Sequence, residues 1–203
     1  MIRIDRAENV WTATIARPDK ANSLTGEMLE RLVQIAGQAR AAAIGALILT
    51  GEGKVFSAGA DLDEARAGLA TSPLWEALSA AIEGLPCLTV AALNGTLAGG
   101  AFGMALACDL RIAVPEATFF YPVMRLGFLP QPSDPVRMAR LIGPARTKMI
   151  LMAGQKIGAG EALAWGLVDR IVPREALART VAELTADATA ARPGHVAAIK
   201  ALI

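Results

Sequence analysis

The sequence predicts an α/β fold built on a parallel sheet, and three observations point to it. Residues 46–50 form a short apolar run closed by Gly51 and Gly53, which suits a strand buried on both faces. Apolar residues at helical spacing precede this run. An apolar strand, a glycine turn and the start of a helix then occur twice along the chain. Such alternation of strands and helices is typical of parallel sheets covered by helices.

The elements of the first half follow from this pattern in order. A strand is expected over residues 10–15, where apolar and polar side chains alternate before the turn at Arg17-Pro18-Asp19. A helix follows, because Met28, Leu32 and Ala36 recur at helical spacing. After the strand at 46–50, a second helix is expected just beyond Gly59, where acidic residues gather in the first turn.

The second half repeats the unit before the chain becomes mainly helical. A strand is expected over residues 87–93, a turn at Asn94-Gly95, and a helix from Ala98 through Ala107. Residues 109–114 and 118–121 are expected as further strands. The remainder reads as helix apart from residues 168–172. We expect a single domain over 1–203, with a core over about 1–143 and a helical region over about 144–203.

The charge balance and composition exclude several classes of protein. Twenty Lys and Arg residues against nineteen Asp and Glu residues leave a net charge of +1, which argues against a nucleic-acid binder or a polybasic membrane patch. With 54% hydrophobic residues the chain can bury a sizeable core and is far from the composition of disorder. The uncharged run at 84–108 has the length of a membrane span, but Pro86 and several glycines break it.

The cysteine and histidine content is low. Cys87 and Cys108 make no disulfide framework and no secretory leader is recognisable, so a reducing cytoplasm is the expected location. The single histidine, His195, lies at the start of a terminal helix, where a surface or capping role is favoured over catalysis. The sequence therefore indicates neither a Ser-His-Asp hydrolase nor a metal site.

The two glycine turns raise the possibility of an oxyanion hole. Each turn leaves backbone N–H groups at a helix start without intrahelical partners, near Ala60 and Gly100. If these groups point at one spot, they would stabilise negative charge on a carbonyl oxygen. The alternative is that both are ordinary tight turns, and spacing alone favours that reading. Dinucleotide, nucleotide-phosphate and nucleophile-elbow motifs all fail at residues 51–59.

Five segments in collinear order carry a resemblance to a known family. They are Ala16-Arg17-Pro18-Asp19-Lys20-Ala21-Asn22-Ser23-Leu24 and the segments at residues 50–62, 92–101, 108–113 and 160–173. Together they resemble the crotonase (enoyl-CoA hydratase/isomerase) superfamily along nearly the whole chain. The resemblance implies a spiral of repeated ββα units, with the backbone N–H groups of Ala60 and Gly100 forming an oxyanion hole. It also implies an acyl-CoA thioester as substrate, no permanently bound cofactor, and homotrimers that often pair into hexamers.

The same resemblance assigns residues to coenzyme A and substrate binding. Those it implies are Lys20, Ala21, Ala58, Gly59, Asp61, Leu62, Gly99, Pro122 and Val123. Two of these assignments have structural alternatives. Lys20 can equally be a solvated surface lysine, and Asp61 can serve as an acid at a helix N-terminus without touching a ligand.

The catalytic acids of the family are replaced in this chain. In hydratases of the superfamily two glutamates stand where this sequence has Gly103 and Val123, so a standard hydratase is not expected. The aspartate of related isomerases and dehalogenases falls on Gln131. The remaining candidates for an acid or base are Asp134 and Tyr121.

Both candidates also have structural alternatives. Asp134 precedes Pro135, an arrangement typical of a helix N-cap, and this interpretation is favoured over catalysis. Tyr121 can simply pack with Phe119 and Phe120.

The expected function is therefore an acyl-CoA-binding, enolate-stabilising lyase or isomerase. Decarboxylation demands least of the site, because loss of CO₂ generates the enolate directly. By the same resemblance, members of the superfamily commonly continue for several helices beyond residues 197–203, so a shortened C-terminal region is expected here. The alternative is a catalytically inactive acyl-CoA-binding or assembly protein, since a fold can persist without its chemistry.

Overall fold

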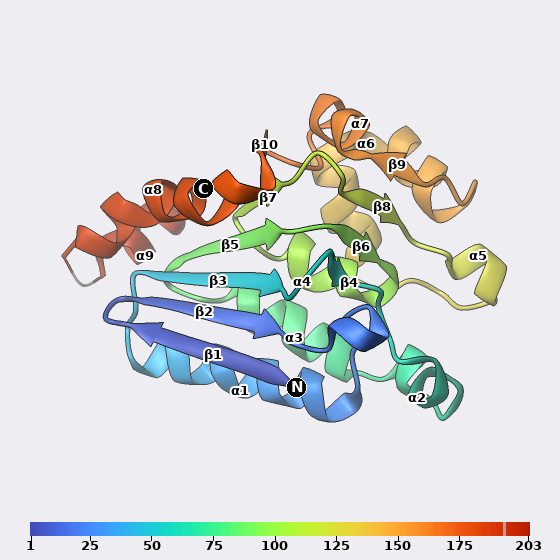
Figure 1. The fold of residues 1–203 in the computed structure, drawn as a ribbon, viewed down its shortest axis with the longest axis horizontal. Coiled ribbons are helices and arrows are strands. Elements are labelled where there is room, and N and C mark those ends of the chain that lie inside the picture. The colour runs from blue at the N-terminus through green and yellow to red at the C-terminus, as the bar shows by residue number, and fades with distance from the viewer. Residues whose placement is uncertain (193) are drawn as a thin grey trace.

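The computed structural model describes residues 1–192 and 194–203, and its strands form two sheets (Figure 1). The six-stranded sheet runs in the order β1 (Ile2–Ala7), β2 (Val10–Ile15), β3 (Ala46–Gly51), β5 (Leu88–Leu93), β7 (Leu110–Ala113) and β10 (Arg170–Ile171). The four-stranded sheet runs in the order β4 (Val55–Ser57), β6 (Thr96–Ala98), β8 (Thr118–Phe120) and β9 (Ile157–Gly158).

Three consecutive ββα units link the two sheets. They are β3–β4–α2, β5–β6–α4 and β7–β8–α5, in which α2 is Leu62–Arg66, α4 is Phe102–Leu106 and α5 is Val123–Leu126. The first strand of each unit lies in the large sheet and the second in the small sheet, and strands of successive units pair in parallel. The expected α/β class and the expected repetition of ββα units are confirmed.

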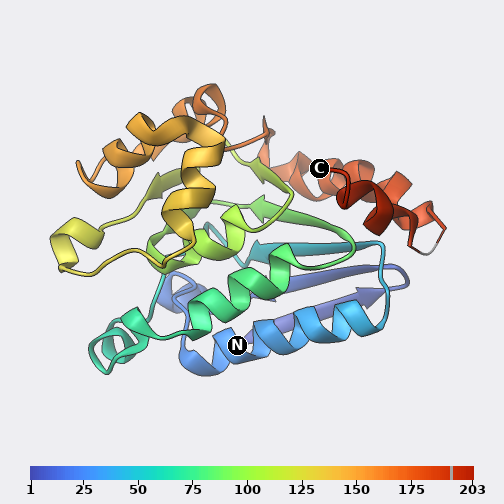
Figure 2. The same cartoon turned by 180° about the vertical axis from the view of Figure 1, so that it is seen from behind.

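Helices cover both faces of the large sheet. α1 (Gly26–Ala41) and α3 (Leu74–Glu83) pack together against one face, as the view from behind shows (Figure 2). Apolar side chains on one side of α1, such as Leu29 and Leu32, are buried, and the Thr25 hydroxyl caps the helix by accepting the Met28 N–H. α8 (Leu177–Ala190) lies along the other face, beside β3 and β5.

The chain after α5 contributes to both sheets. α6 (Asp134–Leu151) is kinked at Gly143, and β9 then pairs with β8. After α7 (Ala159–Trp165), β10 pairs with β7. The last helix, α9 (His195–Lys200), follows α8. None of the helices in residues 1–192 and 194–203 combines the length and apolar character needed to cross a membrane.

The structure differs from the sequence-based assignment mainly at short elements. Strands β1, β4, β6 and β9 were not expected; β4 and β6 have only three residues each and β9 has two, too few for a visible alternation. The helix expected just after Gly59 begins at Leu62, because Asp61 is its N-cap. The helix expected from Ala98 to Ala107 is divided into a 3₁₀ turn, Gly99–Ala101, and α4.

Candidate active site

Two glycine turns meet at the end of the small sheet. Because β4 and β6 pair in parallel, the chain leaves both strands on the same side. It turns there at Gly59 and Gly99, whose φ angles are +91° and +56°, a region that favours glycine. A Cβ atom on Gly59 would lie 2.9 Å from the carbonyl oxygen of Ala98, and one on Gly99 would lie 3.6 Å from the Gly59 Cα. Glycine at both positions therefore allows the two turns to approach closely.

The residues that follow these glycines present free backbone donors to one cavity. Within the described chain the N–H groups of Ala60 and Gly100 donate no hydrogen bond, and both residues line a cavity of about 340 Å³. Leu24 holds the backbone on either side of Ala60. The Leu24 N–H donates to the Gly59 carbonyl, and the Leu24 carbonyl accepts the Asp61 N–H, both at 2.8 Å. The Asp61 N–H thus faces Leu24, and the Ala60 N–H faces away from it. We call the Ala60 and Gly100 N–H groups the backbone donor pair.

Most of the cavity wall is apolar. The Trp75 ring packs beside Gly100, where an added Cβ would lie 3.2 Å from three ring atoms, and its indole N–H donates to the Leu69 carbonyl at 2.8 Å. The residues that complete the wall belong mainly to α2, α5 and the loop that follows α5. They are Ala58, Leu62, Ala65, Ala70, Gly99, Phe120, Tyr121, Pro122, Val123, Arg125, Leu126, Phe128, Leu129 and Gln131.

The cavity separates the site residues expected from sequence into two groups. Those that line it are Ala58, Ala60, Leu62, Gly99, Gly100, Tyr121, Pro122 and Val123. Those that do not line it are Lys20, Ala21, Gly59, Asp61 and Asp134. Trp75 and Gln131 also line the cavity, and nothing in the sequence pattern distinguished Trp75 from an ordinary core tryptophan.

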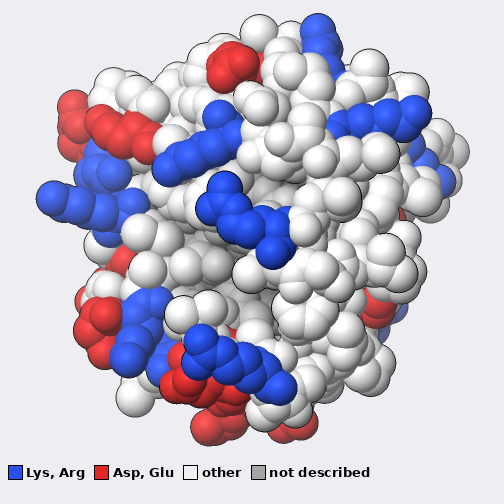
Figure 3. Space-filling view, turned by 90° about the vertical axis from the view of Figure 1, so that its right-hand side faces the viewer, with Lys and Arg blue, Asp and Glu red and all other residues white. Residues whose placement is uncertain are grey.

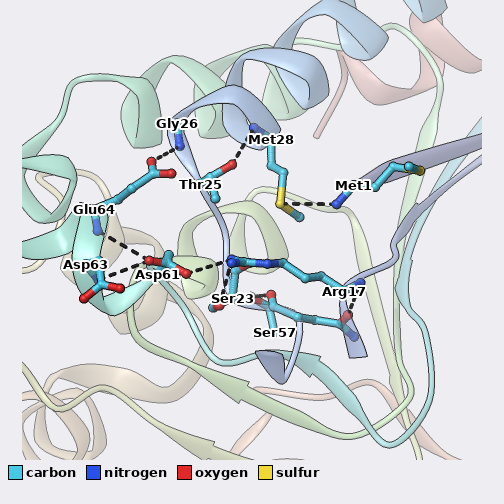
Figure 4. Close-up of polar contacts among 11 residues, drawn as sticks. Met1, Arg17, Ser23, Thr25, Gly26, Met28, Ser57, Asp61, Asp63 and Glu64 are labelled. Carbon is cyan, nitrogen blue, oxygen red and sulfur yellow. Dashed lines mark hydrogen bonds and ion pairs between the residues drawn. The ribbon is translucent and has the colours of Figure 1, made fainter. Parts of the chain in front are cut away.

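The segment around Ala21 and Asp61 supports the wall from behind. The Ala21 carbonyl accepts the N–H of Ala58 at 3.0 Å, while Lys20 is exposed. Asp61 caps α2 by accepting the N–H of Asp63 at 3.1 Å, and its other oxygen pairs with Arg17 at 2.8 Å (Figure 4). The hydrogen bond from the Arg17 guanidinium holds the pKa of Asp61 below its usual value. The Asp61 carboxylate is thus engaged by the protein itself, as the helix N-terminal alternative expects.

Tyr121 and Asp134 form a buried hydrogen-bonded pair, which we call the acid pair. The Tyr121 hydroxyl donates to Asp134 Oδ2 at 2.9 Å and accepts the backbone N–H of Gln131 at 3.4 Å. The Tyr121 ring stacks on Phe102, with 5.5 Å between ring centroids. The alternative in which Tyr121 packs only with Phe119 and Phe120 is therefore wrong, because its hydroxyl is held by a specific partner.

The favoured interpretation of Asp134 as a helix N-cap is also wrong. Asp134 is the first residue of α6, Ser133 is the N-cap, and no side chain caps this helix. The Asp134 side chain instead turns inward to Tyr121 and is fully buried. Its Oδ1 is the only buried side-chain nitrogen or oxygen in the described residues that lacks a hydrogen-bond partner.

Burial changes the acidity of both members of the acid pair. It raises the pKa of Asp134 to about 7, although the hydrogen bond from Tyr121 opposes that rise. Burial and the nearby Asp134 carboxyl group raise the pKa of Tyr121 well above its usual value. At neutral pH the phenol is protonated, and a substantial fraction of Asp134 is protonated as well.

The cavity wall carries little charge. Among the described residues that line it, none is Asp, Glu, His or Cys, and Arg125 is the one charged side chain. Lys156 lies over the Phe120 ring, 5.3 Å from its centroid. Figure 3 shows the face that carries α2 and α5, with a hollow near its centre; Lys and Arg side chains lie closest to the hollow, and Asp and Glu side chains lie farther out on the same face. This charge distribution suits an anionic ligand.

Comparisons with known proteins agree on one family. The family model described as enoyl-CoA hydratase/isomerase matches residues 5–203. A 4-chlorobenzoyl coenzyme A dehalogenase from an Arthrobacter species is 33% identical over 205 residues, covering 96% of this chain and 74% of that protein.

Solved structures show the same relationship. The enoyl-CoA hydratase of Bacillus anthracis superposes with a TM-score of 0.91 at 34% identity, covering 98% of this chain and 81% of that one. DspI of Pseudomonas aeruginosa superposes with a TM-score of 0.90 at 29% identity, covering 99% and 85% of the two chains. The chain therefore belongs to the enoyl-CoA hydratase/isomerase family, which is the crotonase superfamily.

Proposed function

We propose that this protein binds an acyl-CoA thioester, stabilises its enolate and protonates it, as a lyase or isomerase does. One observation carries the proposal: the backbone donor pair and Tyr121 line the same cavity, and Asp134 supports Tyr121 from behind. The names of the relatives, which include a hydratase and a dehalogenase of coenzyme A thioesters, support this substrate class.

The backbone donor pair supplies the electrophilic half of the chemistry. An enolate carries negative charge on the thioester oxygen, and two fixed N–H dipoles at Ala60 and Gly100 stabilise it without reorganising. Removing one such donor typically costs about 3 kcal/mol of transition-state stabilisation. Among the residues that the structure describes, these donors have no partner to lose when the thioester oxygen arrives.

The acid pair supplies a proton. Tyr121 is protonated at neutral pH, and Asp134, with a pKa of about 7, can return the proton that Tyr121 gives up. In the reverse direction the ionised Asp134 can accept a proton through Tyr121. This relay delivers or removes one proton at a time, as enolate protonation and isomerisation require.

Decarboxylation of a carboxylated acyl-CoA makes the smallest demand on this cavity. The bond between Cα and the carboxylate carbon breaks, CO₂ leaves, and the electron pair remains as the thioester enolate. Tyr121 then protonates Cα, and Asp134 reprotonates Tyr121. Hydration is disfavoured, because no described carboxylate lines the cavity to activate water.

The test is a comparison of substrates with the wild-type protein. A panel of malonyl-type, enoyl and saturated acyl-CoA thioesters is incubated in D₂O, and NMR follows CO₂ loss, double-bond migration and exchange of the Cα protons. We expect exchange or decarboxylation for at least one thioester. Binding of the panel without any of these changes would contradict the proposal and favour a catalytically inactive acyl-CoA-binding protein.

We also propose a homotrimer or a hexamer as the assembly. Large apolar side chains near the cavity and at the C-terminus are exposed in the single chain, among them Met124, Leu129 and Leu202. Sedimentation equilibrium measures the assembly directly. A monomer at all concentrations would contradict this proposal.

A further inference from the structure

Gly103 lies where a side chain would collide with the acid pair. It is a helical residue of α4, three positions after Gly100. A Cβ atom at this position would lie 2.6 Å from Ser79 Oγ and 2.9 Å from Asp134 Oδ1. Real Cβ atoms do not approach oxygen this closely, so any larger residue must displace one or both side chains.

The displacement would be transmitted to Tyr121. Asp134 Oδ1 faces the position that a Cβ atom on Gly103 would occupy. The other oxygen of the same carboxyl group accepts the hydrogen bond of the Tyr121 hydroxyl. Phe102, the neighbour of Gly103 in α4, stacks on the Tyr121 ring. The carboxyl group thus lies between α4 on one side and the phenol on the other, and among the described residues the Tyr121 hydroxyl is its only hydrogen-bond partner.

We propose that Gly103 is a positioning residue, which keeps open the space that the Asp134 carboxyl group needs to support Tyr121. The Asp134 side chain, which belongs to α6, thereby occupies the space beside α4 that the missing side chain of Gly103 would otherwise fill. This inference rests on the proposed function for its catalytic meaning, but the positioning itself can be measured without turnover.

Few charged groups surround Asp134, and they determine how its ionisation can be measured through Tyr121. The charged and titratable groups that act on it are Tyr121, Glu76 of α3 and Arg137 of α6. Glu76 raises the pKa of Asp134 and Arg137 lowers it, and both are engaged by other partners: Glu76 accepts from Ser133, and Arg137 pairs with Glu83. A titration sensed by Tyr121 therefore reports Asp134 above all.

The experiment uses the fact that Tyr121 is the only tyrosine in the chain. Protein labelled with ¹³C at the tyrosine Cζ gives one NMR signal, which is followed from pH 5 to pH 9. In the wild type we expect an inflection as Asp134 ionises, and in Asp134→Asn we expect none. In Gly103→Ala we expect the inflection to be lost or displaced.

The matched control is Gly37→Ala, because Gly37 also lies within a helix and has no atom within 4 Å of an added Cβ. This variant should titrate as the wild type does. If Gly103→Ala fails to fold, Gly103→Ala combined with Ser79→Ala and Asp134→Ala should restore folding, because both oxygen atoms that the methyl group would meet are then gone. Failure of this triple variant to recover, while Ser79→Ala with Asp134→Ala alone folds, would contradict the inference.

Turnover gives the second readout. Gly103→Ala should slow Cα proton exchange by about 10²-fold, as misplacement of a catalytic group by about 1 Å does, yet should not slow it further in an Asp134→Ala background. A wild-type titration in Gly103→Ala would overturn the inference. A lost inflection together with a wild-type protein that catalyses nothing would leave the inference standing and overturn the proposed function instead.

Discussion

The backbone donor pair and Tyr121 of the acid pair line one cavity, yet the two pairs are built in opposite ways. The donor pair consists of N–H groups fixed by two glycine turns and carries no titratable group. The acid pair consists of two buried side chains whose pKa values are both raised. Backbone dipoles act at every pH, whereas the acid pair acts only in one protonation state. Binding and proton transfer should therefore respond differently to mutation and to pH.

The largest effect is expected from Tyr121→Phe, which removes the hydroxyl group and keeps the ring. Turnover should fall by about 10²–10⁴-fold, the usual contribution of a general acid. Affinity for acetoacetyl-CoA should remain nearly unchanged, because the donor pair is intact. Kinetics and calorimetry on the same sample separate the two quantities. Equal losses of turnover and of affinity would show that Tyr121 also contributes to binding, and would contradict the separation of the two regions.

The next effect is expected from Gly59→Ala. The left-handed conformation at Gly59 and the contact with the Ala98 carbonyl both oppose a methyl group, so the turn must shift the Ala60 donor. Loss of one donor corresponds to about 3 kcal/mol, or about 10²-fold in turnover. Here affinity for the enolate form of the ligand should fall as well.

The control for Gly59→Ala is Gly53→Ala, which also has a positive φ, of +76°, but whose added Cβ would meet only Pro18 at 3.6 Å. It should lose stability through backbone strain alone and keep its affinity. If both variants lose affinity equally, the contact between the two turns is not what places the donor.

An effect on stability rather than on turnover, with a definite sign, is expected from Asp134→Asn. The pKa of Asp134 is about 7 in the folded chain and about 3.9 in an unfolded chain, so the folded state holds more protons between these values. The free energy of unfolding of the wild type should therefore fall as the pH rises from about 4 to 7, by about 4 kcal/mol. Asp134→Asn should lack this decline. Parallel pH profiles for the two proteins in urea unfolding would contradict the assignment.

The smallest effect is expected from Asp61→Asn. The amide oxygen can still cap α2, while the charge that pairs with Arg17 is lost. Stability should decrease slightly, and more at low salt than at high salt. Affinity for acetoacetyl-CoA should not change. A marked loss of affinity would return Asp61 to the ligand-binding residues.

The contrast between the two regions also explains what the sequence could predict. Ala60 and Gly100 directly follow Gly59 and Gly99, so local glycine turns pointed to them as candidate donors, although spacing alone favoured ordinary tight turns and the family resemblance was needed to assign the role. The repetition of strand, glycine turn and helix is visible for the same reason, whereas the ββα character of the units was expected only from the family resemblance, because the short second strands β4 and β6 give no pattern. The strands that were missed are short or, like β1, depend on pairing with a neighbour.

The sequence identified Tyr121 and Asp134 as candidate acids, but the hydrogen bond between them could not be predicted. Tyr121 and Asp134 are 13 residues apart, and the other oxygen of the Asp134 carboxyl group faces Gly103 of a different helix. Local rules favoured a helix cap for Asp134, because Asp before Pro is a common helix start. Only the tertiary packing that buries this carboxyl group shows its hydrogen bond to Tyr121.

The most direct test of the account is a calorimetric titration of the wild-type protein with acetoacetyl-CoA, beside plain CoA under the same conditions. The enolised form of acetoacetyl-CoA places an oxyanion where the backbone donor pair is expected to act. We predict clearly tighter binding of acetoacetyl-CoA than of CoA. Equal affinity for the two ligands, or no binding of either, would contradict the claim that Ala60 and Gly100 form a working oxyanion hole.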